Sequence, residues 1–299
     1  MKNNIPVVIF HDNDDKYLEY SIKSAEKFNE TVVLLGTKKN KDFCKIWFDT
    51  AEFDMSMYKE FEKVYMHMSS NTHKFEITAF KKYYVLQQYM ETNEIEKCVL
   101  LDSDVLTYVN YSDLPYINSV DVSVALALEQ PQYRWTASGH TFICSKKALN
   151  DFISFFYNTY KDNIEILNKK WEYHIKNNVK GGICDMTLLY LWINDKNNSY
   201  SILNILEVNS GSVFDNSMQS SSDLIKNQYK YNKILKLKKV NFKNGLPYFE
   251  DINNKLIKVN TLHFQGSSKA VMGNYLKKDG VIKIMFNRYR ELIKRVIKK

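Results

Sequence analysis

Two aspartates separated by one serine, Asp102 and Asp104, directly follow a short apolar segment, Lys97–Leu101. The composition of that segment predicts a buried strand that ends at the acidic pair. In open α/β folds, ligands bind at the carboxyl ends of the parallel strands. Residues at i and i+2 of an extended backbone point to the same side. The spacing therefore predicts that both carboxylates face one ligand site.

Two neighbouring carboxylates favour a bound cation. At about 4 Å and an effective dielectric of about 20, they repel each other by about 4 kcal/mol. Divalent cations relieve this repulsion, and they are commonly shared between protein carboxylates and the phosphates of a substrate. The pair therefore predicts a metal-dependent enzyme that acts on a phosphorylated ligand, with a nucleotide sugar as the leading candidate.

The order of apolar segments predicts an α/β fold. The chain opens with a strand at Pro6–Phe10, a helix at Tyr17–Phe28 and a strand at Thr31–Leu35, which is a parallel βαβ pattern. Later helices are expected at 57–66, 75–90 and 148–160 and from Asp185 onward, and later strands at 46–48, 120–128, 141–144, 202–208 and 255–263. We expect a mostly parallel central sheet flanked by helices. The polar segment 209–250 is expected to cross the active face as an excursion.

Composition and cysteine usage indicate a globular, intracellular protein. Of the 299 residues, 44% are hydrophobic and 25% are charged, and only 9 glycines and 4 prolines are present. The 4 cysteines are widely spaced, which favours reduced, buried thiols over a zinc site. The N-terminus lacks the apolar segment of a signal peptide, and no apolar run reaches transmembrane length. We therefore expect a cytoplasmic location.

The excess positive charge lies mainly at the C-terminus. The net charge is +8, and residues 281–299 contain seven basic residues and one acidic residue. Apolar residues recur there with helical spacing, which predicts a basic amphipathic helix over 277–299. Two interpretations stay open: the helix docks on the protein with a solvated basic face, or it contacts an anionic membrane and makes the protein peripheral at its inner face. Nucleic-acid binding is disfavoured, because the rest of the chain is nearly neutral.

A second polar motif follows the last predicted strand. His263 ends that strand, and Gly266 and Lys269 come three and six residues later. An imidazole among carboxylate ligands suits Mn²⁺. Gly266 would let the backbone approach a phosphate, and Lys269 would supply a positive charge for a diphosphate. These groups can stabilise the charge on a departing nucleoside diphosphate.

The two motifs resemble those of glycosyltransferase family 8, the glycogenin and lipopolysaccharide-galactosyltransferase family. His263-x-x-Gly266-x-x-Lys269 is similar to its C-terminal motif, and Asp102-Ser103-Asp104 is similar to its metal motif. From the first strand to about Met272, the chain also resembles bacterial transferases that build lipopolysaccharide or capsule. Family 8 usually follows its lysine with Pro-Trp, whereas this chain has Ala270-Val271. Retention and inversion of the anomeric configuration therefore both stay open.

The resemblance implies a GT-A (Rossmann-like) domain over 1–276. In it, about residues 1–130 would form the nucleotide-binding half and about residues 131–276 the acceptor-side half, followed by the basic helix 277–299. It also implies that Mn²⁺, or Mg²⁺ in its place, is bound by Asp102, Asp104 and His263. The implied donor-binding residues are Phe10, His11, Asp12, Lys82, Asp102, Ser103, Gly139, His140, Gly266 and Lys269. Ordinary turns at 10–12 and 138–141, and a solvated Lys82, are the competing interpretations.

Two carboxylates are candidates for the general base. Asp185 follows Gly181 and Gly182 at the start of a predicted helix, and Glu129 lies at the end of a predicted strand. If the enzyme inverts, Asp185 is the first candidate and Glu129 the second. The competing role for Asp185 is a first-turn or capping acid. If the enzyme retains, no strong base is required, since the leaving phosphate can accept the proton.

These observations predict a metal-dependent glycosyltransferase of the hexosyltransferase type. Its donor would be a nucleotide sugar, preferably UDP-linked, and its acceptor a glycan or glycolipid in surface polysaccharide or lipooligosaccharide synthesis. Two alternatives stay open. A phosphohydrolase can also carry Asp-x-Asp after a strand, although there the motif usually lies on the first strand. A non-catalytic carbohydrate-binding protein could have kept a transferase fold.

Overall fold

The computed structural model describes residues 4–278, 283–287 and 290. In it, the predicted βαβ unit supplies two neighbouring strands, β1 and β2, of an eight-stranded sheet. The strand order is β3-β2-β1-β4-β8-β6-β7, and β9 pairs with β6. The parallel half consists of β1 (Val7–His11), β2 (Val32–Gly36), β3 (Ile46–Asp49) and β4 (Lys97–Leu101). The other half consists of β6 (Val122–Leu126), β7 (Ala137–Ser138), β8 (Thr141–Ser145) and β9 (Ile202–Asn204). All pairs among β1 to β4 are parallel, and β8 runs antiparallel to β4 and β6.

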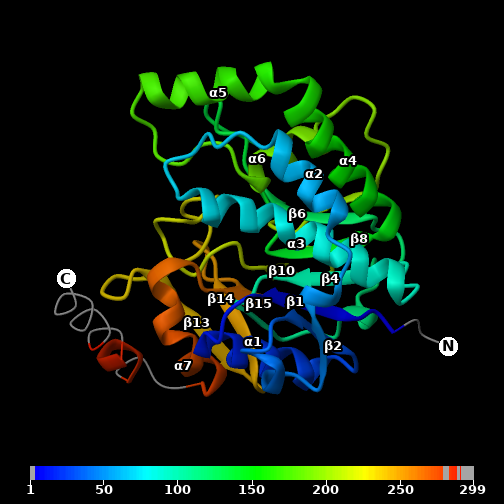
Figure 1. Cartoon of the computed structure of the whole chain (residues 1–299). Coiled ribbons are helices and arrows are strands. Elements are labelled where there is room, and N and C mark those ends of the chain that lie inside the picture. The colour runs from blue at the N-terminus through cyan, green and yellow to red at the C-terminus, as the bar shows by residue number, and fades with distance from the viewer. Residues whose placement is uncertain (1–3, 279–282, 288–289, 291–299) are drawn as a thin grey trace.

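Helices cover both faces of this sheet (Figure 1). One face carries α2 (Ser56–Val64), α3 (His73–Thr92), α4 (Lys146–Asp162), α5 (Ile164–Lys176) and α6 (Asp185–Ile193), and the other carries α1 (Lys16–Phe28). Thr72 and Ser145 cap the starts of α3 and α4, each accepting a backbone N–H three residues on. The predicted α/β class is confirmed, since a central mostly parallel sheet is flanked by helices.

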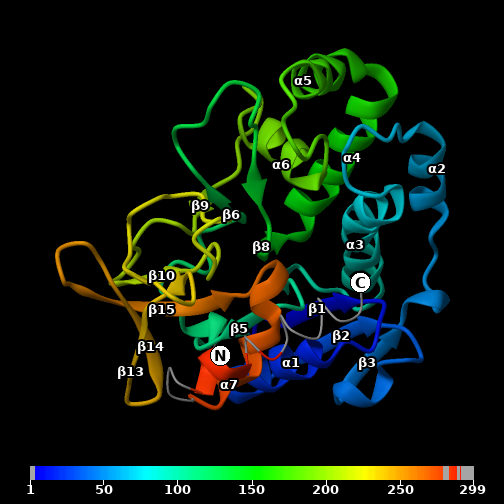
Figure 2. The same ribbon diagram turned by 90° about the vertical axis from the view of Figure 1, so that its left-hand side faces the viewer.

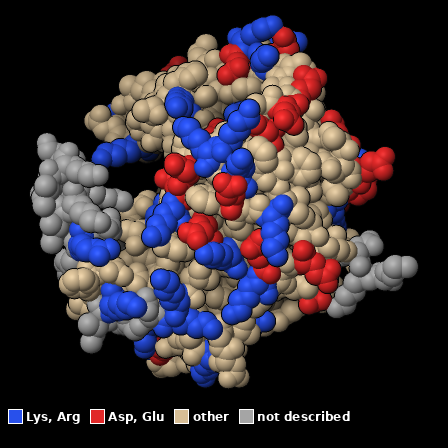
Figure 3. Space-filling view, turned by 60° about the horizontal axis from the view of Figure 1, so that its bottom comes forward, with Lys and Arg blue, Asp and Glu red and all other residues tan. Residues whose placement is uncertain are grey.

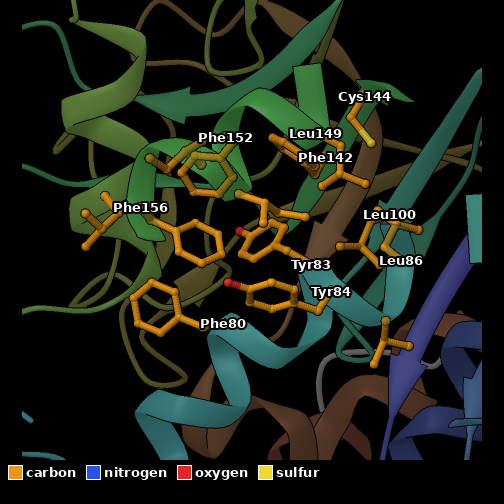
Figure 4. Packing of buried hydrophobic residues seen from close by; sticks show 14 of the residues in the cluster. Phe80, Tyr83, Tyr84, Leu86, Leu100, Phe142, Cys144, Leu149, Phe152 and Phe156 are labelled. Atoms are coloured by element: carbon orange, nitrogen blue, oxygen red, sulfur yellow. The ribbon is translucent and has the colours of Figure 1, made fainter. Parts of the chain in front are cut away.

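Alternation along the strands produces two separate cores. Val8 and Leu100 face the helical layer, whereas Val7 and Ile9 face α1. Figure 4 shows aromatic and aliphatic side chains of α3 and α4 meeting above β4 and β8. Tyr83 packs edge-on against Phe152, with ring centroids 5.1 Å apart. This packing fixes α3, which carries Lys82 toward the end of β4.

A second sheet lies beside the first. Its order is β10-β15-β14-β13, with β5 paired to β15. It consists of β5 (Val105–Thr107), β10 (Ser212–Phe214), β13 (Val240–Lys243), β14 (Leu246–Glu250) and β15 (Leu256–His263). A small pair, β11 (Tyr231–Asn232) with β12 (Leu237–Lys238), adjoins it. Figure 2 shows β15 beside β5, with the β13–β14 hairpin projecting from the sheet.

The second sheet corrects the expectation for residues 209–250. The segment is not an irregular excursion, because it supplies β10 to β14 and an apolar core that includes Val213, Leu237 and Phe249. The apolar residues in it are too scattered to reveal short strands that pair with distant partners. No helix was expected at Ile164–Lys176, where the structure has α5. The strands predicted at 120–128 and 202–208 are shorter than expected.

After β15, η4 (Gly266–Val271) and α7 (Met272–Leu276) pack on α1 and the second sheet. Most of the predicted basic helix lies outside the described residues. Residues 283–287 are helical. Ile284 is buried, and Met285 packs against the apolar core of the second sheet. Among the described residues, no helix combines the length and apolar character needed to cross a bilayer.

Candidate active site

The acidic pair lies where the chain leaves the first sheet and enters the second. After β4 ends, the carbonyl of Asp102 accepts a hydrogen bond from the N–H of Val105 at 3.1 Å. Residues Asp102–Val105 therefore form a tight turn, and the extended backbone expected for the pair is wrong. The turn is required because β5 belongs to the second sheet and runs antiparallel to β15.

The same strand pairing brings His263 to the acidic pair. In the β5–β15 ladder, His263 is opposite Val105, and the N–H of Phe264 donates to the carbonyl of Asp104 at 2.9 Å. Ligand atoms of Asp102, Asp104 and His263 lie within 4.8 Å of one another. His263 Nε2 is 3.3 Å from Asp104 Oδ1. Asp104 and His263, which are separated by about half of the chain, thus share one site with Asp102.

The three side chains fit a divalent cation. Nδ1–H of His263 donates to the carbonyl of Asn216 at 2.6 Å, so Nε2 carries the lone pair in the neutral ring. Asp104 is 7% exposed and His263 is 2% exposed. Burial would raise the pKa of Asp104, but His263 and Lys269 hold it well below its ordinary value. Two carboxylates with one imidazole form a ligand set that Mn²⁺ accepts.

A buried polar network holds His263 from behind. Its backbone N–H donates to Asp215 Oδ2 at 3.0 Å, and Asp215 Oδ1 lies 2.7 Å from the ammonium of Lys238. Lys238 is also 2.8 Å from Asp223. The ring of His140 stacks on His263 with centroids 4.2 Å apart. Sequence reasoning missed Asp215 and Lys238, because nothing in their neighbourhoods along the chain points to residue 263.

Two lysines neutralise the carboxylates around the site. Lys269 Nζ is 3.0 Å from Asp104 Oδ2. Lys82 Nζ is 3.4 Å from Asp102 Oδ1 and 3.1 Å from Asp185 Oδ2. Burial would lower the pKa of Lys82, but Asp102 and Asp185 raise it well above its ordinary value. Lys82 therefore remains cationic and links the predicted metal site to Asp185.

Asp185 is the predicted base that lies at the site. It is buried in the first turn of α6, and its Oδ2 also accepts a hydrogen bond from Tyr83 at 3.2 Å. The two glycines before it bring the segment against Met68 and Ser69, where Ser69 and Gly182 form an isolated β-bridge. This contact fixes the start of α6 relative to α3.

A cleft of about 800 Å³ opens over these groups. Ten of the predicted site residues line it: Phe10, Lys82, Asp102, Ser103, Asp104, Gly139, Asp185, His263, Gly266 and Lys269. Its wall also includes Asn71, Phe75, Met186, Gln265 and Ser267, which the sequence did not single out. Gln265 and Ser267 lie inside the His263–Lys269 motif and could have been found by their position. Asn71 and Phe75 carry no such signal.

Four predicted residues do not line the cleft. His11 bonds Ser103 Oγ at 2.9 Å through Nδ1, and Asp12 pairs with Lys81 at 3.4 Å. His140 is fully buried behind His263, with Nδ1 bonded to Ser138 and Nε2 to the carbonyl of Asp215. His11 and His140 thus contact side chains that line the cleft, whereas Asp12 contacts Lys81, which does not line it.

Glu129 is the fourth predicted site residue that does not line the cleft. It is exposed in the loop between β6 and β7 and is absent from the lining of the cleft. The reason is that β6 ends at Leu126, three residues before Glu129, so the chain has already left the sheet edge.

Comparison with known proteins gives structural neighbours but no family. No model of a protein family and no curated protein matches the chain, so the resemblance to family 8 rests on the two motifs. Mouse xyloside xylosyltransferase 1 in its apo form overlaps 67% of this chain and 84% of its own, with 13% identity and a TM-score of 0.44. A glycosyltransferase involved in glycosylation of the major capsid of PBCV-1 overlaps 53% and 67%, with 12% identity and a TM-score of 0.31. Since these overlaps are partial, the chemistry of this chain must follow from its own residues.

Proposed function

We propose that this protein is a metal-dependent glycosyltransferase that takes a sugar from a nucleotide-sugar donor, UDP-linked by preference. The observation that carries the proposal is the convergence of Asp102, Asp104 and His263 at the floor of a cleft that also presents Lys269. This arrangement suits a diphosphate, because the carboxylates and imidazole hold a cation and the lysine adds a second positive charge.

Each group has a distinct part in this chemistry. A bound Mn²⁺ or Mg²⁺ would supply the charge that stabilises a departing nucleoside diphosphate. Lys269 pairs with Asp104 and can reach a phosphate oxygen from the same wall of the cleft. Gly266 has φ +55°, and its hydrogen-only side chain leaves backbone accessible beside that lysine.

Asp185 is the candidate base if transfer inverts the sugar. Lys82 and Tyr83 both contact its Oδ2, which orients the carboxylate at the cleft wall. A carboxylate held in this way can accept the proton of an acceptor hydroxyl. If transfer retains the configuration, the Lys82–Asp185 pair positions the donor sugar instead.

The finer assignments extend the same proposal. The sugar would be a hexose, and the acceptor would be a glycan or glycolipid of a surface polysaccharide or lipooligosaccharide. The enzyme would work in the cytoplasm, with the basic residues of 281–299 holding it at the inner face of a membrane.

The test is a panel of UDP-sugars with Mn²⁺, with and without EDTA, read out as slow donor hydrolysis and as donor binding. We expect turnover only with metal, and a loss of about 100-fold or more in Asp104→Asn, since a direct ligand matters at least as much as its supporting residues. Asp42→Asn, an exposed change of the same charge, is the matched control. Donor binding and donor hydrolysis that are unchanged by EDTA in the parent would contradict the proposal.

Two further readouts address the alternatives. Turnover of p-nitrophenyl phosphate without any use of UDP-sugars would indicate a phosphohydrolase. Binding of free glycans without donor binding would indicate a carbohydrate-binding protein.

A further inference from the structure

A second cavity, of about 590 Å³, adjoins the cleft and shares Gly266 and Lys269 with it. Its walls come from the start of α1, from η4 and α7, and from Lys283, Asn287 and Arg290. Five of its lining residues are basic: Lys16, Lys269, Lys277, Lys283 and Arg290. Among the described lining residues, Asp15 is the one acidic side chain. We call this space the basic cavity.

The carboxylate of Asp15 already has hydrogen-bond partners. Its Oδ2 lies 3.0 Å from His11 Nε2 and accepts a hydrogen bond from Tyr17 at 3.2 Å. The first turn of α1 also begins at this wall, so the positive end of the helix dipole adds to the lysines. Five basic side chains and one acidic side chain therefore line the described part of the basic cavity, so cationic groups outnumber carboxylates along its walls.

The walls are fixed by core packing. A Cβ on Gly273 would lie 2.6 Å from the ring of Tyr20, so the backbone of α7 rests directly against α1. Beside Lys283 in the chain, Ile284 is buried and Met285 packs in the same core as α7. The five cations are therefore carried by three segments that pack together. Figure 3 shows Lys and Arg side chains gathered on the lower left of the view.

We propose that the basic cavity binds the phosphate group of a second ligand while the donor occupies the cleft. Lysine and arginine side chains that line an open cavity can recognise phosphate oxygens, and the volume leaves room for the sugar or glycerol attached to them. Because Lys269 is common to both spaces, that phosphate would lie next to the donor diphosphate. The role of this ligand as an acceptor rests on the proposed transferase function, whereas phosphate binding itself does not.

The experiment is a ³¹P NMR titration with inorganic phosphate, with and without saturating UDP and Mg²⁺. Lys16→Gln/Lys277→Gln removes two exposed cations that line the basic cavity but not the cleft. Lys45→Gln/Lys59→Gln is the matched control, with the same charge change at exposed positions lining neither space. We expect about tenfold weaker phosphate binding in the first variant only, with UDP binding unchanged in both.

A second arm identifies the source of the phosphate. Sedimentation with vesicles of phosphatidylcholine, with or without phosphatidylglycerol, is compared for the same proteins. Binding to phosphatidylglycerol vesicles that is lost in Lys16→Gln/Lys277→Gln supports a lipid headgroup. Phosphate binding without vesicle binding supports a soluble phosphorylated acceptor.

Two results would overturn the proposal. One is equal phosphate binding by the two double variants, and the other is complete displacement of phosphate by UDP, which would place it in the cleft. If no UDP binds but phosphate binding still depends on Lys16 and Lys277, the transferase function fails while the phosphate site stands.

Discussion

At the scale of single residues, His263 is oriented by groups that never reach the cleft. The side chain of Asp215 accepts a hydrogen bond from the backbone N–H of His263, and the carbonyl of Asn216 accepts one from Nδ1 of its ring. Asp215 is in turn paired with Lys238 in a fully buried setting. Removing one partner of a buried ion pair costs about 3–5 kcal/mol, because the other charge is left uncompensated.

Asp215→Asn and Asp223→Asn separate the two consequences of this network. Both weaken the Lys238 ion cluster, so both should lower the free energy of unfolding in urea. Only Asp215 contacts His263. We expect Mn²⁺ affinity, measured by calorimetry, to fall about 10–100-fold in Asp215→Asn and to change little in Asp223→Asn. Equal losses of affinity would mean that the network acts through stability alone.

Lys170 provides a pH-dependent test at the same scale. It is 2% exposed, donates to the carbonyl of Arg134 and the hydroxyl of Thr187, and is held by burial at a pKa of about 8. The unfolded chain, with a lysine pKa of about 10.4, binds more protons between these values. The free energy of unfolding should therefore rise as pH increases from about 8 to about 10.

The measurement is urea unfolding of the parent and of Lys170→Met across this range. The variant should lack the part of the positive slope that Lys170 contributes, even though its overall stability is lower. Identical slopes in the two proteins would contradict the burial of a charged amine at this position.

At the scale of elements, α6 carries Asp185 and begins from a glycine pair pressed against the loop before α3. A Cβ on Gly182 would lie 2.2 Å from the carbonyl oxygen of Met68. The N–H of Ile183 donates to that same oxygen at 2.7 Å, so the two segments cannot separate without losing a buried hydrogen bond.

Gly182→Ala should therefore displace the start of α6. We expect it to cost about 1–3 kcal/mol of unfolding free energy and to lower donor turnover by moving Asp185. Gly211→Ala is the control, since Gly211 has φ +78° but has no atom within 4 Å of an added Cβ. The control should lose about 1 kcal/mol from backbone strain and keep full turnover. Full activity in Gly182→Ala would show that the position of α6 is not critical.

At the scale of the whole molecule, the candidate metal site joins two sheets. Asp102 and Asp104 lie between β4 and β5, and His263 ends β15. A cation bound there should slow hydrogen exchange in both sheets together, because opening either one breaks the ligand set.

Hydrogen exchange with mass spectrometry tests this coupling. In the parent, Mn²⁺ should protect peptides that cover the ends of both β4 and β15, and His263→Ala should lose protection in both. Protection confined to one sheet would mean that the ion does not bridge them.

The sequence by itself determined the α/β class and the ends of the strands that matter. Apolar runs ending at polar residues identified β1 and β4, and helical spacing identified α1 and α3, because these patterns report local burial. The chemical types at 102–104 and 263–269 indicated a metal and phosphate site before any contact was known.

Tertiary structure decided how those residues meet. The turn at Asp102, the antiparallel pairing of β5 with β15 and the network behind His263 all join residues far apart in the chain. The local spacing of apolar residues does not reveal such pairings, since the register of a sheet is set by non-local hydrogen bonds and packing. For the same reason, the sequence did not reveal the second sheet or the absence of Glu129 from the lining of the cleft. It also could not show that the basic cavity shares Lys269 with the cleft.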